Sequence, residues 1–154
     1  MLSKKDPLNW GCCLHFRSCR YHAGFYFYHP LMQNVDYSWR VEPGSHYSCD
    51  LTDDPFLQMK SNNKTLGFAL TDRAQQGAVT NLWPITLQFM MHEYQHILQA
   101  TETIFKWMFD ADTSFNSCHI QSSFQIVNMA FLRSHEYQKY FNYLDSSGGF
   151  FYER

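Results

Sequence analysis

The residues with the most direct chemical meaning are His92, Glu93 and His96, which form the pattern H-E-x-x-H within the stretch MMHEYQHILQ. On a helix this spacing places two imidazoles one turn apart, where they can bind zinc while the glutamate activates a water molecule. The pattern therefore suggests a zinc metallopeptidase. Such a site needs a third ligand, and Glu102 stands at the spacing that one large class of these enzymes uses.

The helix that would position these residues gives reasons against a metal site. A helical period is predicted from Pro84 to about Ala100, and the two histidines lie roughly opposite its apolar stripe, on the side expected to face solvent. That class of enzymes also turns the chain at a glycine, where this sequence has Gln99. A helix that continues through Gln99 holds Glu102 away from the metal, so the zinc hypothesis is kept only as a distant alternative. The apolar stripe consists of Leu87, Met91, Tyr94 and Leu98.

The composition predicts one folded domain and excludes several classes of function. The chain has 154 residues, with 12 basic and 14 acidic side chains, so no excess of charge predicts binding to nucleic acid or to an anionic membrane. Aromatic residues make up 18% of the chain, which favours a packed fold with aromatic-lined clefts over a disordered segment. No apolar run is long enough to span a bilayer, and the start does not resemble a signal peptide. If the protein is luminal, its targeting segment is absent from this sequence.

The cysteines and one short motif bear on the compartment. The chain has five cysteines, an odd number, and their spacings match no C-x-x-C zinc knuckle. Asn63-Lys64-Thr65 is the single clear N-x-[ST] acceptor for N-glycosylation, which would suit a secreted or luminal protein. One such tripeptide also arises often by chance.

The hydrophobic pattern predicts an α/β fold with a mixed sheet flanked by helices. Strands are expected at VDYSWRVEP, where Pro43 stops the strand, at TLGFALT and at CHIQSSFQIV. A short helix is expected to begin at DDPFLQM, with Asp53 or Asp54 as the cap and Pro55 in the first turn. Further helices are expected at the start of residues 12–29, near residues 101–109, and from about His135 to Leu144, where Gly148 and Gly149 end the helical region.

Six segments give the chain a specific resemblance to a known family. They are CRYHAGFYFYHPLM, YSWRVEPGSHYSCDL, DPFLQMKSNNKTLGFAL, LWPITLQFM, CHIQSSFQI and YQKYFNYLDSSGGFFYER. In order and spacing they resemble the fungal α-1,2-mannosyltransferases of glycosyltransferase family fifteen, from about residue 15 to the last residue. The resemblance implies an incomplete GT-A-like α/β glycosyltransferase domain, because the family domain begins before residue 15 and continues after Arg154. Residues 1–14 are then a divergent start, and residues 15–154 are the central part of the catalytic domain.

The resemblance also offers an explanation of the zinc pattern. Family members commonly carry His-Pro-Glu-Tyr in this helix region. The proline is absent here, so His92 stands directly before Glu93, and with His96 nearby the pattern H-E-x-x-H arises by accident.

The family resemblance implies an activity. These enzymes transfer mannose from GDP-mannose to the 2-hydroxyl of a mannose-terminated glycan acceptor, with retention of the α configuration. They do so in the Golgi lumen, in protein glycosylation and the synthesis of fungal cell-wall mannan. They use Mn²⁺, and Glu42 matches the family's metal-binding glutamate. The position is physically reasonable, because Glu42 ends a predicted strand and Pro43-Gly44 follow it, at the edge of a sheet where ligands usually bind. Whether the acceptor is N-linked, O-linked or lipid-linked stays open.

The resemblance assigns four further residues to substrate binding. His15 stands where the family has a tyrosine near the site, and His119 and Tyr152 match family positions. Arg20 matches a family arginine that lines the site, where a guanidinium could pair with phosphate; a structural ion pair is an equally open alternative. Trp39 is most simply a core residue, and stacking on a sugar is the alternative.

One departure from the family concerns the catalytic position. Where the family usually reads Cys-His-Phe-Trp-Ser-Asn-Phe-Glu-Ile, residues 118–126 read CHIQSSFQI, so the glutamate proposed as the nucleophile corresponds to Gln125. A neutral amide cannot attack the anomeric carbon as a carboxylate does. If attack is instead front-face and assisted by the leaving phosphate, Gln125 could still orient substrate. Two hypotheses therefore stand before the zinc peptidase: an active α-1,2-mannosyltransferase, and a catalytically inactive or truncated remnant of that family.

The resemblance also bears on the cysteines. Cys49 and Cys118 fall in family-like segments, so any structural disulfide is expected to use at least one of them. Cys12 and Cys13, in the divergent start, are expected to be free.

Overall fold

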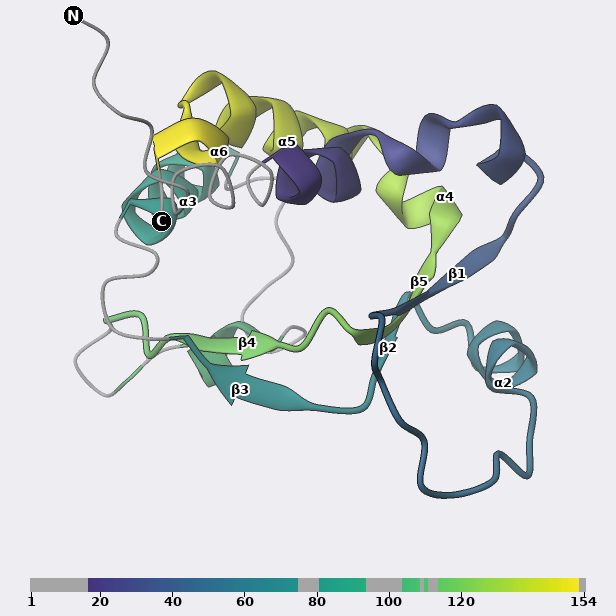
Figure 1. The fold of residues 1–154 in the computed structure, drawn as a ribbon. Coiled ribbons are helices and arrows are strands. Elements are labelled where there is room, and N and C mark those ends of the chain that lie inside the picture. Colours follow the sequence, from purple (N-terminus) through teal and green to yellow (C-terminus); the bar gives the residue numbers. More distant parts are fainter. Residues whose placement is uncertain (1–16, 75–80, 94–103, 109, 111–113, 153–154) are drawn as a thin grey trace, which may run out of the picture.

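The structure is a computed structural model that describes residues 17–74, 81–93, 104–108, 110 and 114–152. Within these residues two small antiparallel sheets lie below a group of helices (Figure 1). The α/β class and the arrangement of sheet and flanking helices predicted from the sequence are therefore confirmed. The described residues contain no helix that is both long and apolar enough to cross a membrane.

The larger sheet has three strands in the order β1–β5–β2, so β5 lies in the middle. β1 (Tyr37–Val41) and β2 (Leu66–Phe68) both pair antiparallel with β5 (Phe124–Asn128). The smaller sheet pairs β3 (Thr71–Arg73) with β4 (Cys118–Ile120). Both sheets therefore join the first half of the chain to residues 118–128.

Two of the predicted strands are each divided between the sheets. TLGFALT contains β2 and the first residue of β3, and CHIQSSFQIV contains β4 and most of β5. A turn at residues 121–123 separates β4 from β5, and the Gln121 amide there donates to the carbonyl of Leu70 (3.0 Å). The prediction of single strands was wrong at these places. In CHIQSSFQIV the polar residues Gln-Ser-Ser form the break at which the chain passes from one sheet to the other.

The helix α2 (Pro55–Ser61) forms as the sequence predicts. The Asp54 carboxylate accepts hydrogen bonds from the amides of Phe56 (2.8 Å) and Leu57 (3.3 Å), and Pro55 occupies the first helical position. These contacts satisfy amides that have no partner within the helix, and proline has no amide to satisfy there. Asp54 and not Asp53 is therefore the cap.

The helix α5 (His135–Ser146) also matches its prediction. The Ser134 hydroxyl caps it by accepting from the Tyr137 amide (3.3 Å). Gly148 follows with φ +79°, a conformation that glycine adopts without strain. Gly149 does not end the helical region as expected, because it begins the short helix α6 (Gly149–Tyr152).

The helix α3 (Leu82–His92) differs from its prediction in both length and orientation. It begins before Pro84 and ends at His92, and residues 94–103 lie outside the described residues. The predicted apolar stripe does not face the core, since Leu87 is 37% and Met91 80% exposed. Phe89 packs instead on the rings of Tyr140 and Tyr143 in α5. Apolar residues occur on more than one side of this helix, so their spacing did not define a single buried face.

The remaining helical segments are short. Residues 17–24 are helical, as the start of the segment 12–29 predicts, and two 3-10 turns follow, η1 (Tyr26–Tyr28) and η2 (Pro30–Met32). Another 3-10 turn, η4 (Ile104–Met108), lies where a helix was expected near residues 101–109.

The core of the described residues lies between the helices and the larger sheet. Phe27 of η1 and Met129 of the short helix α4 (Met129–Leu132) are fully buried, and Leu132 is 7% exposed. The Arg133 guanidinium closes this cluster by donating to the carbonyls of Phe27 (3.0 Å) and Met32 (2.6 Å). The core thus ties the aromatic segment after residue 24 to the end of β5.

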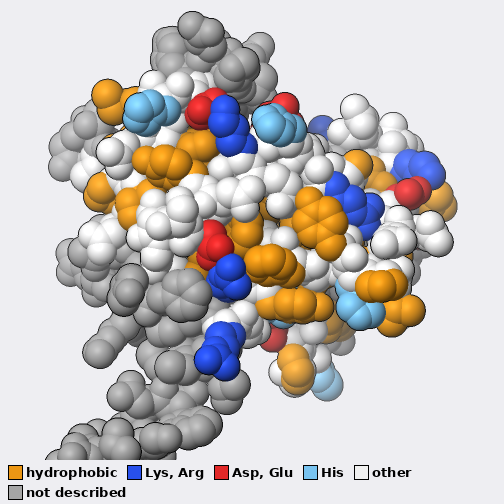
Figure 2. Space-filling view, turned by 90° about the horizontal axis from the view of Figure 1, so that it is seen from above, with side chains coloured by type: hydrophobic (Ala, Val, Ile, Leu, Met, Phe, Trp, Pro, Cys, Tyr) orange, Lys and Arg blue, Asp and Glu red, His pale blue; other side chains and the backbone are white. Residues whose placement is uncertain are grey.

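The helical side of the molecule carries a mixed surface (Figure 2). Hydrophobic side chains lie among scattered basic and acidic ones, and no large area of one charge sign is seen on this face. This agrees with the nearly balanced charge of the sequence.

Candidate active site

The larger sheet presents alternate residues of each strand to opposite faces. Arg40 of β1 lies directly opposite Gln125 of β5, and Ser38 lies opposite Val127. Directly opposed residues in antiparallel strands point to the same face, and every second residue does so along a strand. These four side chains therefore share one face of the sheet, which we call the polar face.

A cavity of about 370 Å³ lies between the polar face and the helices above it. The segment 22–26 and Tyr137 of α5 cover it, and β1 and β5 form its floor. Its lining residues are His22, Ala23, Tyr26, Met32, Ser38, Trp39, Arg40, Gln125, Val127, Leu132 and Tyr137.

Glu42 stands one residue beyond the end of β1, at the edge of the same face. A turn follows it, in which the Ser45 amide donates to the Glu42 carbonyl (3.1 Å) and Gly44 has φ +83°. Proline followed by a glycine with positive φ is the signature of a type II turn, so Pro43-Gly44 reverses the chain here. The Glu42 side chain is 42% exposed as a result, at the end of a fixed strand.

Arg40 binds Glu42 through one carboxylate oxygen. Its Nε and Nη2 atoms lie 2.7 Å and 2.5 Å from the same atom, Glu42 Oε1. The pair places a cation beside the cavity and opposite Gln125 in the sheet. A guanidinium at such a position can bind carboxylate or phosphate oxygens.

His22 is the titratable ring next to this pair. Burial, and secondly the charge of Arg40, lower the pKa of His22, while the charge of Glu42 acts in the opposite direction. The imidazole is therefore neutral near pH 7 and can donate or accept a hydrogen bond. The pKa of Tyr137 is raised to about 12, chiefly by burial, and its hydroxyl donates to the Ala23 carbonyl (2.9 Å), so this phenol supports the helices rather than exchanging protons.

Gln125 is held loosely within the cavity. Its Nε2 atom donates one long hydrogen bond to the carbonyl of Ile120 (3.5 Å). The structure brings Gln125 together with Arg40, and through Arg40 with Glu42. Arg40, Gln125 and Ser38 are the polar side chains of the sheet that line the cavity, and Glu42 lies beyond its edge.

Glu42 was predicted as a metal ligand, and its surroundings limit what it can bind. A carboxylate oxygen suits hard divalent cations such as Mn²⁺. The described part of the chain contains no group of three or more His, Cys, Asp or Glu side chains that could enclose a metal ion. Among the described residues Glu42 therefore fits a cation whose remaining ligands come from outside this part of the chain, such as oxygens of water or of a substrate phosphate.

Arg20, predicted to bind substrate, lies in a bidentate ion pair. Its Nε and Nη2 atoms donate to the two oxygens of Asp145 (2.6 Å and 2.7 Å), and its guanidinium lies 4.8 Å from the centre of the Phe25 ring. The hydrogen bonds lower the pKa of Asp145 and raise the pKa of Arg20. This geometry favours the structural alternative, in which the pair ties the helix of residues 17–24 to α5.

Of the other predicted substrate residues, the structure places only the side chain of His119, and it does not line the cavity. His119 is an exposed residue of β4, opposite Asp72 in the smaller sheet. Tyr152 is the last residue of α6, but its side chain lies outside the described part, as does all of His15. Their assignment to the substrate stays a prediction.

The zinc pattern is not assembled by the described residues. The helix α3 ends at His92, the first histidine of the pattern, and His96 and Glu102 lie outside the described residues. The Glu93 carboxylate lies 2.5 Å from the Lys139 amine of α5, so it joins two helices. A glutamate in an ion pair is a poor base for activating water, which supports the accidental origin of the pattern.

Arg40 and His22 are the residues that the sequence prediction missed. Both lie within segments that carry the family resemblance, but nothing in the sequence showed which residues meet across the sheet. The two-residue period of β1, counted back from Glu42, could have placed Arg40 on the same side as that carboxylate.

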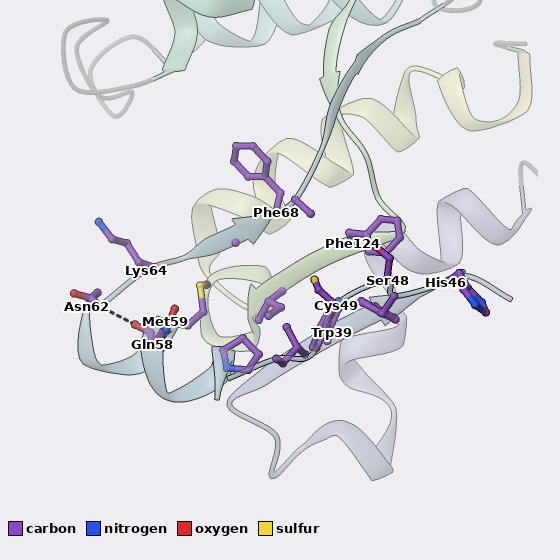
Figure 3. Close-up of a pocket in the computed structure, with 16 residues that line it drawn as sticks. Trp39, His46, Ser48, Cys49, Gln58, Met59, Asn62, Lys64, Phe68 and Phe124 are labelled. Carbon is purple, nitrogen blue, oxygen red and sulfur yellow. Dashed lines mark hydrogen bonds between the residues drawn. The ribbon is translucent and has the colours of Figure 1, made fainter. Parts of the chain in front are cut away.

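The opposite face of the sheet is apolar and lines a larger open pocket of about 640 Å³ (Figure 3). Trp39 contacts Tyr47 edge-to-face, and Tyr47 contacts Phe124 in the same way. Gly67 lets Met59 approach, because a Cβ atom at Gly67 would lie 2.9 Å from the Met59 sulfur. These ring contacts favour the core role expected for Trp39, although its Nε1 is a buried donor without a partner among the described residues.

The cysteine prediction is tested only in part. Cys49 lies exposed at this pocket and Cys118 is buried, and both are free thiols. Neither forms a structural disulfide here. Cys12 and Cys13 lie outside the described residues.

Residues 5–154 match the protein family described as glycolipid 2-alpha-mannosyltransferase. The O-glycoside alpha-1,2-mannosyltransferase homolog 2 of Schizosaccharomyces pombe is 40% identical over 154 residues, which cover 99% of this chain and 41% of that protein. The alpha-1,2 mannosyltransferase KTR1 of Saccharomyces cerevisiae is 38% identical over 136 residues, which cover 88% of this chain and 34% of that protein. The chain thus spans about two fifths or less of the length of these curated relatives.

Two solved structures resemble the fold closely. Core-mannan synthase A from Aspergillus fumigatus, in its Mn/GDP-form, has a TM-score of 0.83 and 32% identity, with 91% of this chain and 40% of that chain covered. The mannosyltransferase Ktr4p from S. cerevisiae, in complex with GDP, has a TM-score of 0.85 and 31% identity, with 91% and 37% covered. The likeness confirms the GT-A-like fold that the sequence predicted, for the part of the domain that this chain spans.

Proposed function

The chain belongs to the glycolipid 2-alpha-mannosyltransferase family, and from this premise we propose that it transfers mannose from GDP-mannose to the 2-hydroxyl of a mannose-terminated glycan. In this proposal the α configuration is retained and Mn²⁺ is the cofactor. The Mn/GDP-form of a similar structure and the GDP complex of another support the choice of donor and metal. The Golgi lumen is part of the same proposal.

The observation that carries the proposal is the Arg40–Glu42 pair opposite Gln125, at the cavity of the polar face. Breaking the sugar–phosphate bond of GDP-mannose leaves negative charge on a diphosphate, which a cation at the site must stabilise. Arg40 supplies one positive charge there. When bound, Mn²⁺ would supply more by neutralising phosphate oxygens.

Glu42 would hold the cation, and Arg40 orients the Glu42 carboxylate. Arg40 uses only the Oε1 atom of Glu42. The second oxygen, Oε2, is not bound by Arg40 and is the atom that would meet a cation bound to phosphate. His22 is neutral near pH 7, so it would form a hydrogen bond with the sugar or phosphate and would not contribute a positive charge.

A second candidate function follows from Gln125. In a double-displacement reaction with retention, a carboxylate attacks the anomeric carbon, and the amide of Gln125 cannot do so. This observation favours a family member that binds donor or glycan without efficient transfer. The two candidates share the site and differ only in the chemical step.

One assay separates these candidates. The full chain is incubated with GDP-mannose, Mn²⁺ and α-methyl mannoside, and the disaccharide product is quantified by mass spectrometry. An active transferase forms the α-1,2 disaccharide, and Glu42→Gln abolishes its formation. A chain that binds GDP, as measured by calorimetry, but forms no product supports the second candidate. A chain that neither binds GDP nor forms product contradicts both.

A further inference from the structure

The turn after α2 contains the sequence Asn63-Lys64-Thr65, to which the proposed function gives no role. The helix ends in a Schellman motif: the Asn63 amide donates to the Lys60 carbonyl (3.2 Å) and the Lys64 amide donates to the Met59 carbonyl (2.9 Å). Asn63 has φ +49°, the left-handed conformation that this motif requires and that asparagine adopts more easily than most residues. The backbone therefore closes the helix without using the Asn63 side chain.

The side chains of this turn point into solvent. Asn63, Lys64 and Thr65 are all exposed. The side-chain amide of Asn63 has no hydrogen-bond partner among the described residues. Lys64 contributes to the wall of the apolar pocket, and Figure 3 shows the amine end of its side chain directed outward. On its other side Asn63 borders a hollow of about 570 Å³ with mostly polar walls, which include Asp36, Lys60 and Arg133. A hydrophilic group attached to Asn63 would find space and polar neighbours.

A second tripeptide in the chain provides a contrast. Asn116-Ser117-Cys118 has the related pattern N-x-C, with a thiol in place of the hydroxyl. Both ends of the Asn116 amide are used: its Nδ2 donates to the Trp107 carbonyl (2.7 Å) and its Oδ1 accepts from the Cys118 amide (2.9 Å). Cys118 is also buried. A group attached to Asn116 would break these contacts, whereas one attached to Asn63 would break none.

We propose that Asn63 is an N-glycosylation site of this protein. The proposal rests on the secretory location included in the proposed function. In the reaction, Nδ2 of Asn63 forms a bond to the anomeric carbon of an oligosaccharide carried on a polyprenyl diphosphate. The bond from that carbon to the diphosphate oxygen breaks, the polyprenyl diphosphate leaves with the electron pair, and one amide proton is released. Thr65 supplies the hydroxyl that the acceptor pattern requires.

The position of the glycan also has a consequence. α2 packs on the apolar face of the sheet, opposite the cavity that contains Arg40 and Gln125. A glycan at the outer end of α2 therefore covers surface without blocking the candidate active site. It would add solubility to a side of the molecule where Leu57 of α2 is 65% exposed.

The test uses the full chain in a eukaryotic host. An added leader directs it into the secretory pathway, and a carboxyl-terminal tag with its own acceptor sequence reports that the chain reached the lumen. Peptide mapping before and after enzymatic removal of N-glycans then shows whether Asn63 was modified, because removal converts a modified asparagine to aspartate. We expect modification of Asn63 and none of Asn116.

Three variants make the assignment specific. Asn63→Gly removes the acceptor nitrogen and keeps the left-handed turn, which glycine adopts without strain. Thr65→Ala keeps the asparagine and removes the hydroxyl. On a denaturing gel, both variants should migrate faster than the unaltered chain, because they lack the glycan at residue 63. The matched control Asn62→Gln should keep that glycan and migrate like the unaltered chain. If the tag is modified while Asn63 of the unaltered chain is not, the proposal is wrong. That outcome leaves the mannosyltransferase proposal standing, because the assay with GDP-mannose tests it separately.

Discussion

Where β1 and β5 pair, the sheet has two faces of different character, although the same two strands build both. The polar face presents Arg40 and Gln125 to a cavity, and Glu42 extends it beyond the strand end. The opposite face presents Trp39 and Ile126 to an apolar pocket under α2. Neighbouring residues of β1 and β5 thus serve different purposes, because successive side chains of a strand point to opposite sides.

Packing and chemistry share one short segment of β1 in this arrangement. In Trp39-Arg40-Val41-Glu42, the first and third residues belong to the apolar face, and the second and fourth belong to the site. Requirements for packing and for chemistry therefore alternate along one segment. Substitutions at adjacent positions should separate activity from stability, and the following predictions test that separation.

The largest effect is expected at Gln125 on the polar face. Gln125→Glu restores a carboxylate opposite Arg40, where it can attack or stabilise the anomeric centre. We expect mannose transfer from GDP-mannose to rise by about two orders of magnitude, which corresponds to ~3 kcal/mol in the barrier. The measurement is the initial rate of disaccharide formation at saturating donor and acceptor.

The matched control adds the same charge on the other face. Gln58 of α2 lines the apolar pocket and is exposed, so Gln58→Glu should leave the rate unchanged. Equal rates for Gln125→Glu and the unaltered chain, with donor binding intact in both, would show that residue 125 is not the nucleophile position. Front-face attack would then be the better account of the mechanism.

The second prediction concerns the apolar face, at the neighbouring residue. Ile126 is 8% exposed, and Ile126→Ala removes buried methyl groups. The loss should lower the free energy of unfolding by about 2 kcal/mol, near the lower end of the usual range, because the adjoining pocket is open and its walls can relax. Chemical denaturation measures this change.

A control on the edge strand keeps this test specific. Val41 of β1 is 50% exposed, so Val41→Ala should cost less than about 1 kcal/mol. If the two variants lose equal stability, the apolar face does not carry the packing assigned to it. Donor binding to the Ile126→Ala variant, measured below its unfolding midpoint, should match that of the unaltered chain.

The local parts of this fold could be predicted from the sequence. Asp54 and Pro55 start α2, Ser134 precedes α5, and Pro43-Gly44 stop β1, because caps and turns depend on residues a few positions apart. Strand pairing depends on residues far apart, so the sequence did not show that Arg40 meets Gln125. The division of CHIQSSFQIV between two sheets was missed for the same reason.

The candidate site was predictable only through the resemblance. Glu42 and Gln125 were identified from matching segments, and the structure brings them to one side of the sheet through Arg40. Arg20 was assigned to the substrate by the same reasoning, yet it binds Asp145, a residue 125 positions away. A matching position does not reveal whether an arginine faces a ligand or another helix, since that depends on a distant carboxylate.

The third prediction tests whether the charges of the polar face contribute to stability. Arg40→Met removes the ion pair with Glu42, whose partners are 38% and 42% exposed. Exposed pairs are screened by solvent, so the free energy of unfolding should fall by less than about 1 kcal/mol, measured by chemical denaturation. Donor binding should fall in the same variant, because the cation beside the cavity is lost. A larger loss of stability with donor binding unchanged would show that Arg40 stabilises the fold and does not bind the donor.

The smallest effect is expected from the Arg20–Asp145 ion pair, which joins the helix of residues 17–24 to α5 above the polar face. Hydrogen bonds from Arg20 hold the pKa of Asp145 below its ordinary value of 3.8, and partial burial opposes them. A carboxylate whose pKa is lower in the folded state stabilises the fold at pH values above its unfolded pKa, and this contribution is lost as the pH falls through the folded pKa. Both partners are partly exposed, so the contribution is modest and should weaken with salt.

Asp145→Asn isolates this contribution, because asparagine cannot titrate. The unfolding free energies of the unaltered chain and of Asp145→Asn should differ at neutral pH and converge as the pH falls below about 4. A difference that stays constant across this range would show that the pair acts through packing of Arg20 on Phe25 and not through charge. The matched comparison repeats the neutral-pH measurement at high salt, where screening should reduce the difference between the two chains. Convergence at low pH together with this loss in salt would identify Arg20–Asp145 as the contact that makes the helices above the polar face sensitive to acid.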